Sequence, residues 1–289
     1  MALVKKANQL INYQYQLSIA EQRLVLYLIG KIQMPDEDFR EYQFTFTELV
    51  KILEVDKNYV YRDLERIRQA LLSKPIIFNI GQGDSDGFNW CSRFTIRRSE
   101  KTVSMRFDPA LKPYLLQLKK CFTRYQIKYV TGFTSKHSFR VYELCKQFEK
   151  LKKRKMELIE FKRILDIENS YSKIYDLKKY VLNPALEDIN EHSDILISAK
   201  YFKTRRSITD IEFTISNKLE NCKNEKQEEM IIEETKEQSR IQEEKIENQE
   251  KSAARTKIWN EMSDADKQKN YPGNSGYIKF MASFTSGHC

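Results

Sequence analysis

The sequence predicts an α+β protein of two tandem winged-helix domains with the same fold, each a helix-turn-helix plus a β-wing, followed by a charged tail. Three phrases occur twice in the same order, at offsets between 112 and 117 residues: "SIAEQRLVLYLIGKI" and "TSKHSFRVYELCKQF", "ELVKILEVD" and "EFKRILDIE", "YRDLERI" and "IYDLKKY". That distance indicates two copies of one domain, because a solenoid repeats at a far shorter period. Each copy runs from two short helical segments through a break and a longer helix to strand-like sequence, the order of a winged DNA reader.

The first copy opens with helices that capping signals locate. Residues 3–11 form a short amphipathic opening, and Ser18 with Glu21 then makes a capping box that predicts a helix to about Ile32. After the alternating, strand-like "EYQFTF", Thr47 is expected to cap a second helix, "ELVKILEV".

The longer helix of the first copy is expected from about Tyr59 to Leu72, where apolar residues recur every three or four positions, and Pro75 ends it. "IIFNI", the turn "GQGDSDG", "FNWCSRFTIRRSE" and "KTVSMRF" read as one β-meander, the wing of this copy. A short helix beginning with Pro109 follows, and "FTRYQIKYVTGF" joins the two copies.

The second copy repeats this order with a tighter wing. Ser135 is expected to cap a helix over 136–151, and the charged run "KLKKRK" is interpreted as its solvated end. The longer helix is "SKIYDLKKYVLNPALEDINEH", which Pro184 should kink or restart. "ILISAKYFKT" and "ITDIEFTIS", joined by "TRRS", predict the second wing.

These elements predict three parts: a first winged-helix domain over 1–125, a second over 126–217, and a charged tail over 218–289. The tail is rich in Glu, Lys and Gln, so much of it cannot bury enough apolar surface to offset its ordering entropy, and we expect it to be helical or disordered. The stretch that carries Trp259, Tyr277 and Phe280 is interpreted as a small docking element.

The charge distribution favours a polyanionic partner. The chain has a net charge of +9, and residues 1–217 hold 38 Lys/Arg against 27 Asp/Glu, whereas residues 218–251 hold 7 against 11. Ordinary solubility charge remains the alternative. Five scattered cysteines indicate reduced thiols, and neither a signal peptide nor a stretch of about 18 apolar residues is present. We therefore expect a cytoplasmic protein with no membrane partner.

The sequence argues against catalysis. Its three histidines are far apart and are interpreted as surface residues, and no loop of the form Gly-x-x-x-x-Gly-Lys-Ser/Thr can hold a triphosphate. We accordingly expect no catalytic residue, no metal site and no cofactor.

The candidate DNA-binding residues lie on the two longer helices and on the wings. In a helix-turn-helix the N-terminal residues of the second helix reach base edges in the major groove. Arginine can pair with guanine and asparagine with adenine, whereas lysine and tyrosine more often hold phosphates. In the first copy the candidates are Lys57, Asn58, Tyr59, Arg62 and Arg66, with Arg93, Arg97 and Arg98 on the wing. In the second copy they are Ser172, Lys173, Tyr175, Asp176, Lys178 and Lys179, with Lys200, Lys203, Arg205 and Arg206 on the wing.

Residues ~3–217 resemble the initiator replication protein family of iteron plasmids (RepB/RepE-type Rep proteins). The resemblance rests on "VKKANQLINYQYQLSIAEQRLVLYLIGKI", "TSKHSFRVYELCKQF" and, above all, "YDLKKYVLNPALEDIN". It implies binding to directly repeated iterons in double-stranded origin DNA, with recruitment of the host initiator and replicative helicase. It also implies a monomer that initiates and a homodimer that represses its own promoter through an inverted repeat. By the same resemblance the second domain is the main reader, through Ser172–Leu182, and the first serves dimerisation and auxiliary DNA contact.

Two other functions stay open. A dedicated transcriptional repressor would carry the same reading elements, so the sequence does not separate it from an initiator. A rolling-circle nicking enzyme needs a histidine pair for its metal beside a catalytic tyrosine, and the sequence offers no such pair.

Overall fold

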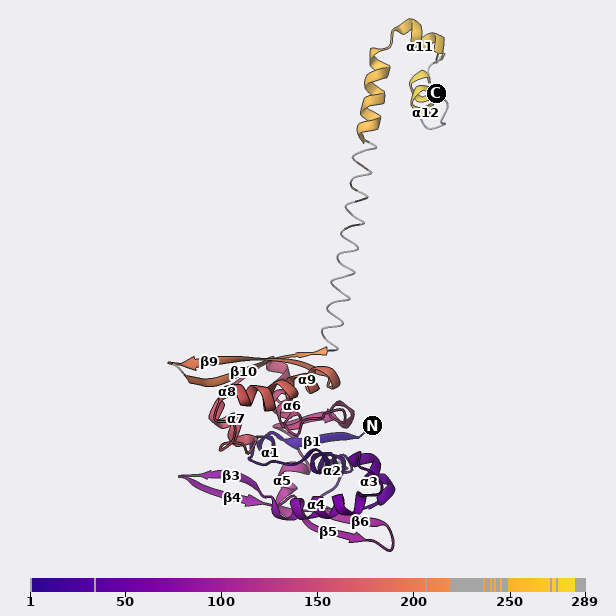
Figure 1. Ribbon diagram of the computed structural model, residues 1–289. Coiled ribbons are helices and arrows are strands. Elements are labelled where there is room, and N and C mark those ends of the chain that lie inside the picture. The colour runs from indigo at the N-terminus through magenta and orange to yellow at the C-terminus, as the bar shows by residue number, and fades with distance from the viewer. Residues whose placement is uncertain are drawn as a thin grey trace. The chain divides into compact units, whose positions relative to one another are not determined.

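The computed structural model describes residues 2–33, 35–205, 207–218, 249–270, 272–273 and 275–283, with the single residues 236, 240, 242 and 245 between them. The chain divides into two compact units, residues 1–221 and 222–289 (Figure 1). The first unit contains both predicted winged helices and is described first.

The first winged helix combines a helix-turn-helix with a three-stranded antiparallel sheet. Its elements are α2 (Ile19–Ile29), β2 (Tyr42–Thr45), α3 (Phe46–Leu53), α4 (Val60–Ser73), β5 (Cys91–Arg97) and β6 (Thr102–Phe107). The strand order is β2-β6-β5, so the third strand lies between the first and the second.

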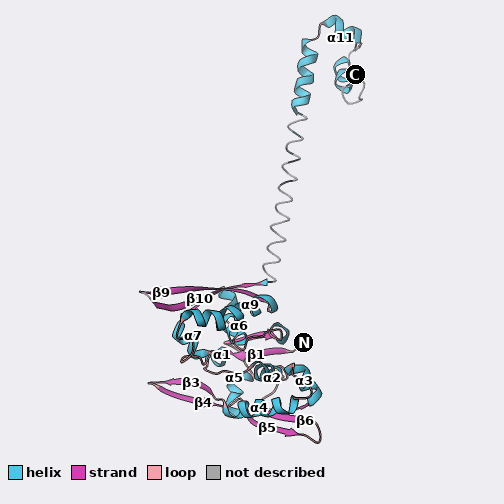
Figure 2. Ribbon diagram, in the orientation of Figure 1, coloured by secondary structure: helices cyan, strands magenta, loops and turns pink. Residues whose placement is uncertain are grey.

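The second winged helix has the same topology. Its elements are α6 (Ser138–Lys146), β8 (Lys153–Glu157), α7 (Leu158–Ile164), α8 (Ile174–Leu177), a π-helical segment (Lys178–Leu182), α9 (Asn183–His192), β9 (Ile195–Thr204) and β10 (Ser207–Asn217). The strand order β8-β10-β9 again places the third strand in the middle. The helices of both copies lie between the two sheets (Figure 2), and the predicted duplication of one fold is confirmed.

The wing of the first copy differs from the prediction. Residues 76–107 do not form one meander, because β3 (Ile76–Gly81) and β4 (Asp84–Phe88) pair only with each other as a separate hairpin. Trp90, which is fully buried, follows this hairpin and anchors the chain in the core before β5 begins. The counterpart of the β9–β10 wing is therefore β5–β6, and β3–β4 is an insertion into the winged-helix pattern.

Two capping predictions have opposite outcomes. The Ser18–Glu21 box is confirmed, since the Ser18 hydroxyl accepts from the Glu21 N–H and the Glu21 carboxylate accepts from the Ser18 N–H at 2.9 Å. The assignment of Thr47 as the cap of α3 is wrong. Thr45 is the cap, because Glu48, three residues later, closes the reciprocal bonds at 2.8 and 3.2 Å.

The start of α6 and the charged run after it also differ from expectation. Helix α6 begins at Ser138, so Ser135 is not its cap, and it ends at Lys146. The run "KLKKRK" is not a helix end, because a 3₁₀ turn and Lys152 at φ 60° lead into the edge strand β8. On that strand Arg154 is only 8% exposed and donates to the Leu144 carbonyl at 2.7 Å.

The N-terminal opening closes the junction between the two winged helices. Residues 3–11 form β1 (Leu3–Ala7) and the start of α1 (Asn8–Asn12), and β1 pairs antiparallel with β7 (Phe122–Gln126). Between the wing and β7, Asp108 caps a 3₁₀ turn that leads into α5 (Lys112–Leu115). One continuous hydrophobic core extends through the whole first unit.

The second unit is helical where it is described. Residues 249–261 are helical and are followed by α11 (Asp264–Asn270) and α12 (Gly276–Ser283). The Trp259 ring lies 5.6 Å from Tyr277 and 5.2 Å from Phe280, centroid to centroid, so the three aromatic residues form a small core. The first part of the predicted tail, residues 219–235, lies outside the described residues. No described helix has both the length and the apolar character of a membrane span.

Candidate nucleic-acid interface

The first reader helix, α4, presents its cations to solvent because its apolar stripe is buried. Val60 and Leu64 pack into the core, and the Arg62 and Arg66 side chains are 55% and 72% exposed. The turn before the helix is fixed by Asp56, whose carboxylate accepts from the Asn58 N–H at 2.8 Å. The candidates Lys57, Asn58 and Tyr59 are all exposed in and just after this turn.

The arginines of α4 are held in defined positions. The Arg62 guanidinium lies over the Tyr59 ring, 4.5 Å from its centroid. Arg62 and Arg66 approach the Asp63 carboxylate at 3.5 and 3.8 Å, pairs that are exposed and contribute little to stability. The Asp63 carboxylate therefore neutralises the charge of these guanidinium groups only in part, and DNA phosphates or base edges can replace it as their partner.

The first wing brings one of its three predicted arginines to this helix. Arg98, in the β5–β6 turn, places its guanidinium 3.4 Å from the Tyr61 ring centroid on α4. Tyr61 in turn donates to Glu65 at 2.7 Å, and that hydrogen bond raises the pKa of the Tyr61 hydroxyl. The predicted Arg93 is exposed but lies at the other end of β5, beside Arg106 across the ladder. The third predicted wing arginine, Arg97, donates to the Ser104 hydroxyl at 2.6 Å.

The second reader is divided into three helical segments. Lys173 is the N-cap of α8, which spans one turn before the π-helical segment, and α9 restarts with Pro184 at its second position. Proline cannot donate to the carbonyl four residues earlier, and widening of the preceding turn accommodates this loss. The change from π-helix to α-helix at Asn183 agrees with the predicted kink or restart at Pro184, and the helix begins at Ile174 and not at Ser172.

Aromatic residues support the cations of the second reader. The Lys178 ammonium lies 3.7 Å from the ring centroid of Tyr201 on β9, and that of Lys179 lies 5.1 Å from Tyr180. Tyr175 is 67% exposed, so an aromatic face is available beside these charges. The candidates Ser172 and Lys173 are exposed, and Asp176 is half-buried.

The second wing carries its cations along one strand and its turn. Lys200 and Lys203 are exposed on β9, and Arg205 occupies a left-handed position at φ 58° in the turn to β10. Arg206 lies outside the described residues. The β9–β10 turn and the β5–β6 turn point to opposite sides of the first unit in Figure 1.

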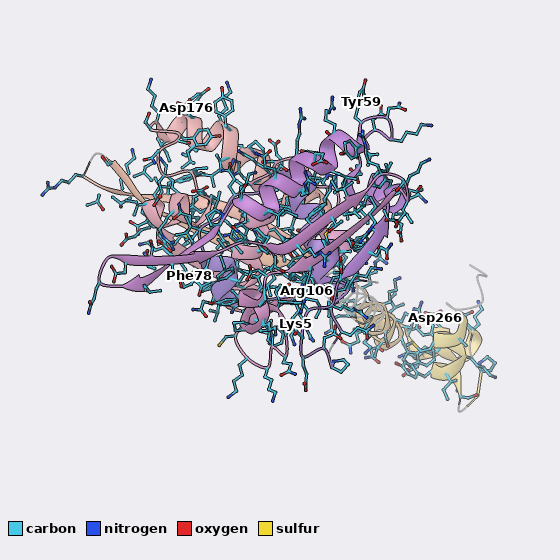
Figure 3. The ribbon with its side chains drawn as sticks, turned by 90° about the horizontal axis from the view of Figure 1, so that it is seen from below. Lys5, Tyr59, Phe78, Arg106, Asp176 and Asp266 are labelled. Atoms are coloured by element: carbon cyan, nitrogen blue, oxygen red, sulfur yellow. The ribbon has the colours of Figure 1, made fainter. Side chains whose placement is uncertain are left out.

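The starts of the two readers lie at one edge of the first unit. Figure 3 shows Tyr59, the N-cap of α4, and Asp176, in α8, both at the upper edge of the molecule in that view. The N-terminal ends of α4 and α8 are thereby brought to one side.

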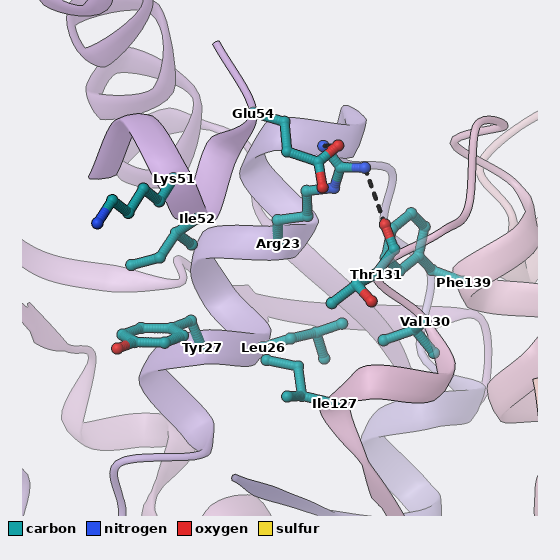
Figure 4. A pocket seen from close by; sticks show the side chains of 10 residues that line it. All are labelled: Arg23, Leu26, Tyr27, Lys51, Ile52, Glu54, Ile127, Val130, Thr131 and Phe139. Carbon is teal, nitrogen blue, oxygen red and sulfur yellow. Dashed lines mark hydrogen bonds and ion pairs between the residues drawn. The ribbon is translucent and has the colours of Figure 1, made fainter. Parts of the chain in front are cut away.

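An apolar pocket of about 240 Å³ lies at the domain junction rather than at the readers (Figure 4). Leu26 and Ile52 line it from the first winged helix and Phe139 from the second. At its rim Arg23 pairs with Glu54 at 2.7 Å and donates to the Thr131 carbonyl at 2.9 Å. This arginine ties α2 to the segment that enters the second winged helix.

One histidine is not the surface residue that the sequence suggested. His137 is 4% exposed, and burial, with a smaller effect from Lys136, lowers its pKa to about 4. His192 is exposed. Within the described part of the chain no group of three or more His, Cys, Asp or Glu side chains is placed to hold a metal ion.

Two family models match the first unit in the order of its winged helices. The one described as "Initiator Replication protein, WH1" matches residues 3–146, and "Initiator Rep protein, WH2" matches residues 157–215. The boundary predicted at residue 125 remains a prediction.

Similar proteins extend this result. A replication initiation protein of Escherichia coli is 30% identical over 203 residues, which are 67% of this chain and 63% of that protein, less than two thirds of its length. An uncharacterized 27.6 kDa protein of Escherichia coli is 23% identical over 68% of this chain and 88% of its own. The crystal structure of Pi initiator protein in complex with iteron DNA superimposes with a TM-score of 0.60 at 18% identity, covering 74% of this chain and 96% of that one.

Proposed function

This chain belongs to the initiator replication protein family, and we propose on that premise that it initiates plasmid replication by binding directly repeated iterons in origin DNA. The observation that carries the proposal is the common edge formed by Tyr59 and Asp176, where both reader helices begin (Figure 3). Two readers on one side of a single compact unit can engage successive major grooves of one duplex.

In this proposal the two winged helices have different roles in DNA binding. The second, within residues 126–217, is the main reader, through Lys173, Tyr175 and Lys179. The first, within residues 1–125, adds contacts from α4 and the Arg98 wing and provides the dimer contact. The Pi initiator, which shares the fold, was crystallised with iteron DNA, which supports the choice of DNA target.

Further steps follow from the family. The monomer recruits the host initiator and the replicative helicase to the origin, and a homodimer represses the protein's own promoter through an inverted repeat. The protein acts in the cytoplasm as a DNA-binding factor without catalysis. No cofactor is needed, since strand opening is driven by binding and by the recruited proteins.

Footprinting on the DNA next to the gene tests the proposal. Protection of several direct repeats of about 20 base pairs, two helical turns with one per winged helix, is the expected result. Protection of a single palindrome alone would assign the protein as a dedicated repressor. A covalent tyrosine adduct on supercoiled origin DNA with Mg²⁺ or Mn²⁺ would assign it as a nicking enzyme.

A further inference from the structure

The pocket at the junction of the two winged helices has apolar walls (Figure 4). Leu26 and Ile52 line it from the first winged helix, Ile127 and Val130 from the segment that joins the two, and Phe139 from the second. Leu26, Val130 and Phe139 are each at most 3% exposed and belong to the continuous core of the first unit. The pocket is therefore a recess in packed core, contacted by both winged helices.

The two ends of the pocket differ in charge. Figure 4 shows Arg23, Glu54 and Thr131 on one side, and the Lys51 ammonium and the Tyr27 hydroxyl on the other. At the first end the charges cancel, because the Arg23 guanidinium pairs with the Glu54 carboxylate at 2.7 Å. At the second end Lys51 is exposed and has no ion-pair partner among the described residues. The Lys51 end therefore carries an uncompensated positive charge.

The first end is built at a conformational cost. Glu54 is the C-cap of α3 and has a φ of 54°, in the left-handed region that favours glycine. The Nε of Arg23 is buried and has no hydrogen-bond partner in the part of the chain that the structure describes. Costs of this kind concentrate at ligand-binding and other functional sites. The Glu54 carboxylate occupies Arg23, so an anion that enters the pocket is directed to Lys51.

The volume of the pocket, about 240 Å³, suits a short aliphatic chain. An apolar cavity of about 150 Å³ holds benzene, so this larger pocket has room for a chain of roughly eight carbons. Small-molecule sites commonly combine apolar walls with a few polar groups that fix the orientation of the ligand. An occupant with an aliphatic chain and one anionic head matches both the walls and the Lys51 end.

We propose that this junction pocket binds a free aliphatic carboxylate of roughly eight carbons, with its chain against Leu26, Ile52 and Phe139 and its carboxylate at the end formed by Lys51 and Tyr27. The ligand contacts both winged helices at once. It therefore binds the folded first unit in preference to the unfolded chain and raises the unfolding temperature. The inference goes beyond the proposed function, because DNA takes no part in this binding.

Calorimetric titration of the full chain with hexanoate, octanoate, octanol and octylamine tests the proposal. The last three ligands share one chain and differ in the charge of the head, whereas hexanoate is two methylenes shorter than octanoate. The first variant, Lys51→Glu, reverses the charge at the proposed head end. Its matched control is Lys119→Glu, at an exposed position outside the pocket. The second variant, Ile52→Trp, fills the pocket with a larger side chain, and a cooperative urea transition shows that it folds.

The unmodified protein and Lys119→Glu should bind octanoate about threefold more tightly than octanol, since an exposed ion pair contributes little, and should bind octylamine most weakly. Octanoate should bind about fifteenfold more tightly than hexanoate, at about fourfold for each buried methylene. In Lys51→Glu, octylamine should become the tightest of the three eight-carbon ligands. Ile52→Trp should weaken octanoate binding by at least about tenfold, because the pocket no longer has room for the chain.

Failure of all four compounds to bind the unmodified protein would overturn the proposal and leave the proposed function standing. An unchanged order of the three heads in Lys51→Glu would also overturn it, because the head would then lie elsewhere. Binding to phosphatidylglycerol vesicles without binding of free octanoate would assign the pocket to a membrane lipid instead. If octanoate raised the unfolding temperature of folded Ile52→Trp as much as that of the unmodified protein, the ligand would occupy another site.

Discussion

Lys6 and Glu143 form an ion pair of 2.7 Å between the N-terminal strand and helix α6, with their side chains 4% and 2% exposed. The Glu143 carboxylate also accepts from the Tyr125 hydroxyl and lies 3.7 Å from Arg140. Tyr125 responds to this environment, since burial and the carboxylate raise its pKa. The pair therefore joins β1, β7 and α6 at the junction of the two winged helices.

Removal of the Lys6 ammonium should destabilise the first unit strongly. Lys6→Met leaves a buried carboxylate with fewer partners, which costs about 3–5 kcal/mol of unfolding free energy. Urea denaturation measures this loss of unfolding free energy. The matched control is Lys119→Met, at an exposed position in the turn before β7, and its effect should stay within about 0.5 kcal/mol. A loss for Lys6→Met no larger than the control's would mean that the buried pair contributes nothing.

Substitutions on the second reader should weaken specific DNA binding. Lys173→Ala or Lys179→Ala each removes one exposed cation beside the helix start and should lower the salt slope by about 1. Titration against origin DNA measures both affinity and slope. The comparison is a chain truncated after Asn221. This truncation keeps strand β10 whole, because its last residue, Asn217, pairs with Ile195 of β9. If the truncation lost as much affinity as either substitution, the assignment of the reader would be wrong.

Binding at the readers should depend steeply on salt. Two reader helices and two wings can neutralise on the order of 6–10 phosphates, and each released counterion contributes about −0.9 to the log–log slope. Affinity for origin DNA between 50 and 200 mM salt gives the slope. A slope shallower than about −3 would mean that most of these cations face solvent.

Stability should fall with acid through His137. Burial holds its folded-state pKa at about 4, below the ordinary 6.5, so the unfolded chain takes up the proton first as the pH falls. The stabilisation is complete above pH 6.5 and is lost progressively down to pH 4, by about 1.4 kcal/mol per pH unit. Between pH 7 and 5.5 the unmodified protein should lose about 1 kcal/mol more than His137→Phe. Equal losses in the two proteins would contradict this assignment.

The two winged helices should change their relative orientation when a dimer becomes a DNA-bound monomer. Direct repeats and an inverted repeat place different demands on the readers, and one rigid arrangement does not serve both. The junction includes polar contacts beside its apolar core, as where the Arg140 guanidinium donates to the Tyr13 carbonyl at 2.7 Å. Labels at Ser85 and Ser207 report the distance between the two hairpins. Identical distance distributions in a protein that demonstrably changes from dimer to monomer would reject the rearrangement.

Local signals predicted the repeated elements well because both copies obey the same rules of capping and periodicity. The Ser18–Glu21 box and the apolar stripe of α4 located their helices correctly. Thr47 was preferred over Thr45 because the preceding strand was expected to extend to Phe46. The β3–β4 hairpin was merged with the wing because its sequence has the same alternation, whereas the strand pairing, with Trp90 buried between β4 and β5, separates the two sheets.

The site was harder to predict than the fold. Exposure of Arg66 follows from the helical periodicity of α4, so the sequence could identify it. Arg98 was recognised as a wing cation, but its contact with the Tyr61 ring joins residues 37 positions apart, and no local pattern encodes it. Arg154 was counted in a solvated charge run, yet it reaches Asn12 at 2.9 Å, which only the tertiary packing reveals.

The pairing of β1 with β7 sets an order for synthesis of the protein. Leu3 is paired with Gln126, so the strand that leaves the ribosome first waits for a partner made roughly 6–25 s later, at 5–20 residues per second. During that interval the nascent chain carries an unpaired N-terminal strand and an inward-facing Lys6 whose carboxylate partner has not been translated. The rate of translation from β1 to residue 143 determines how long this incomplete state lasts.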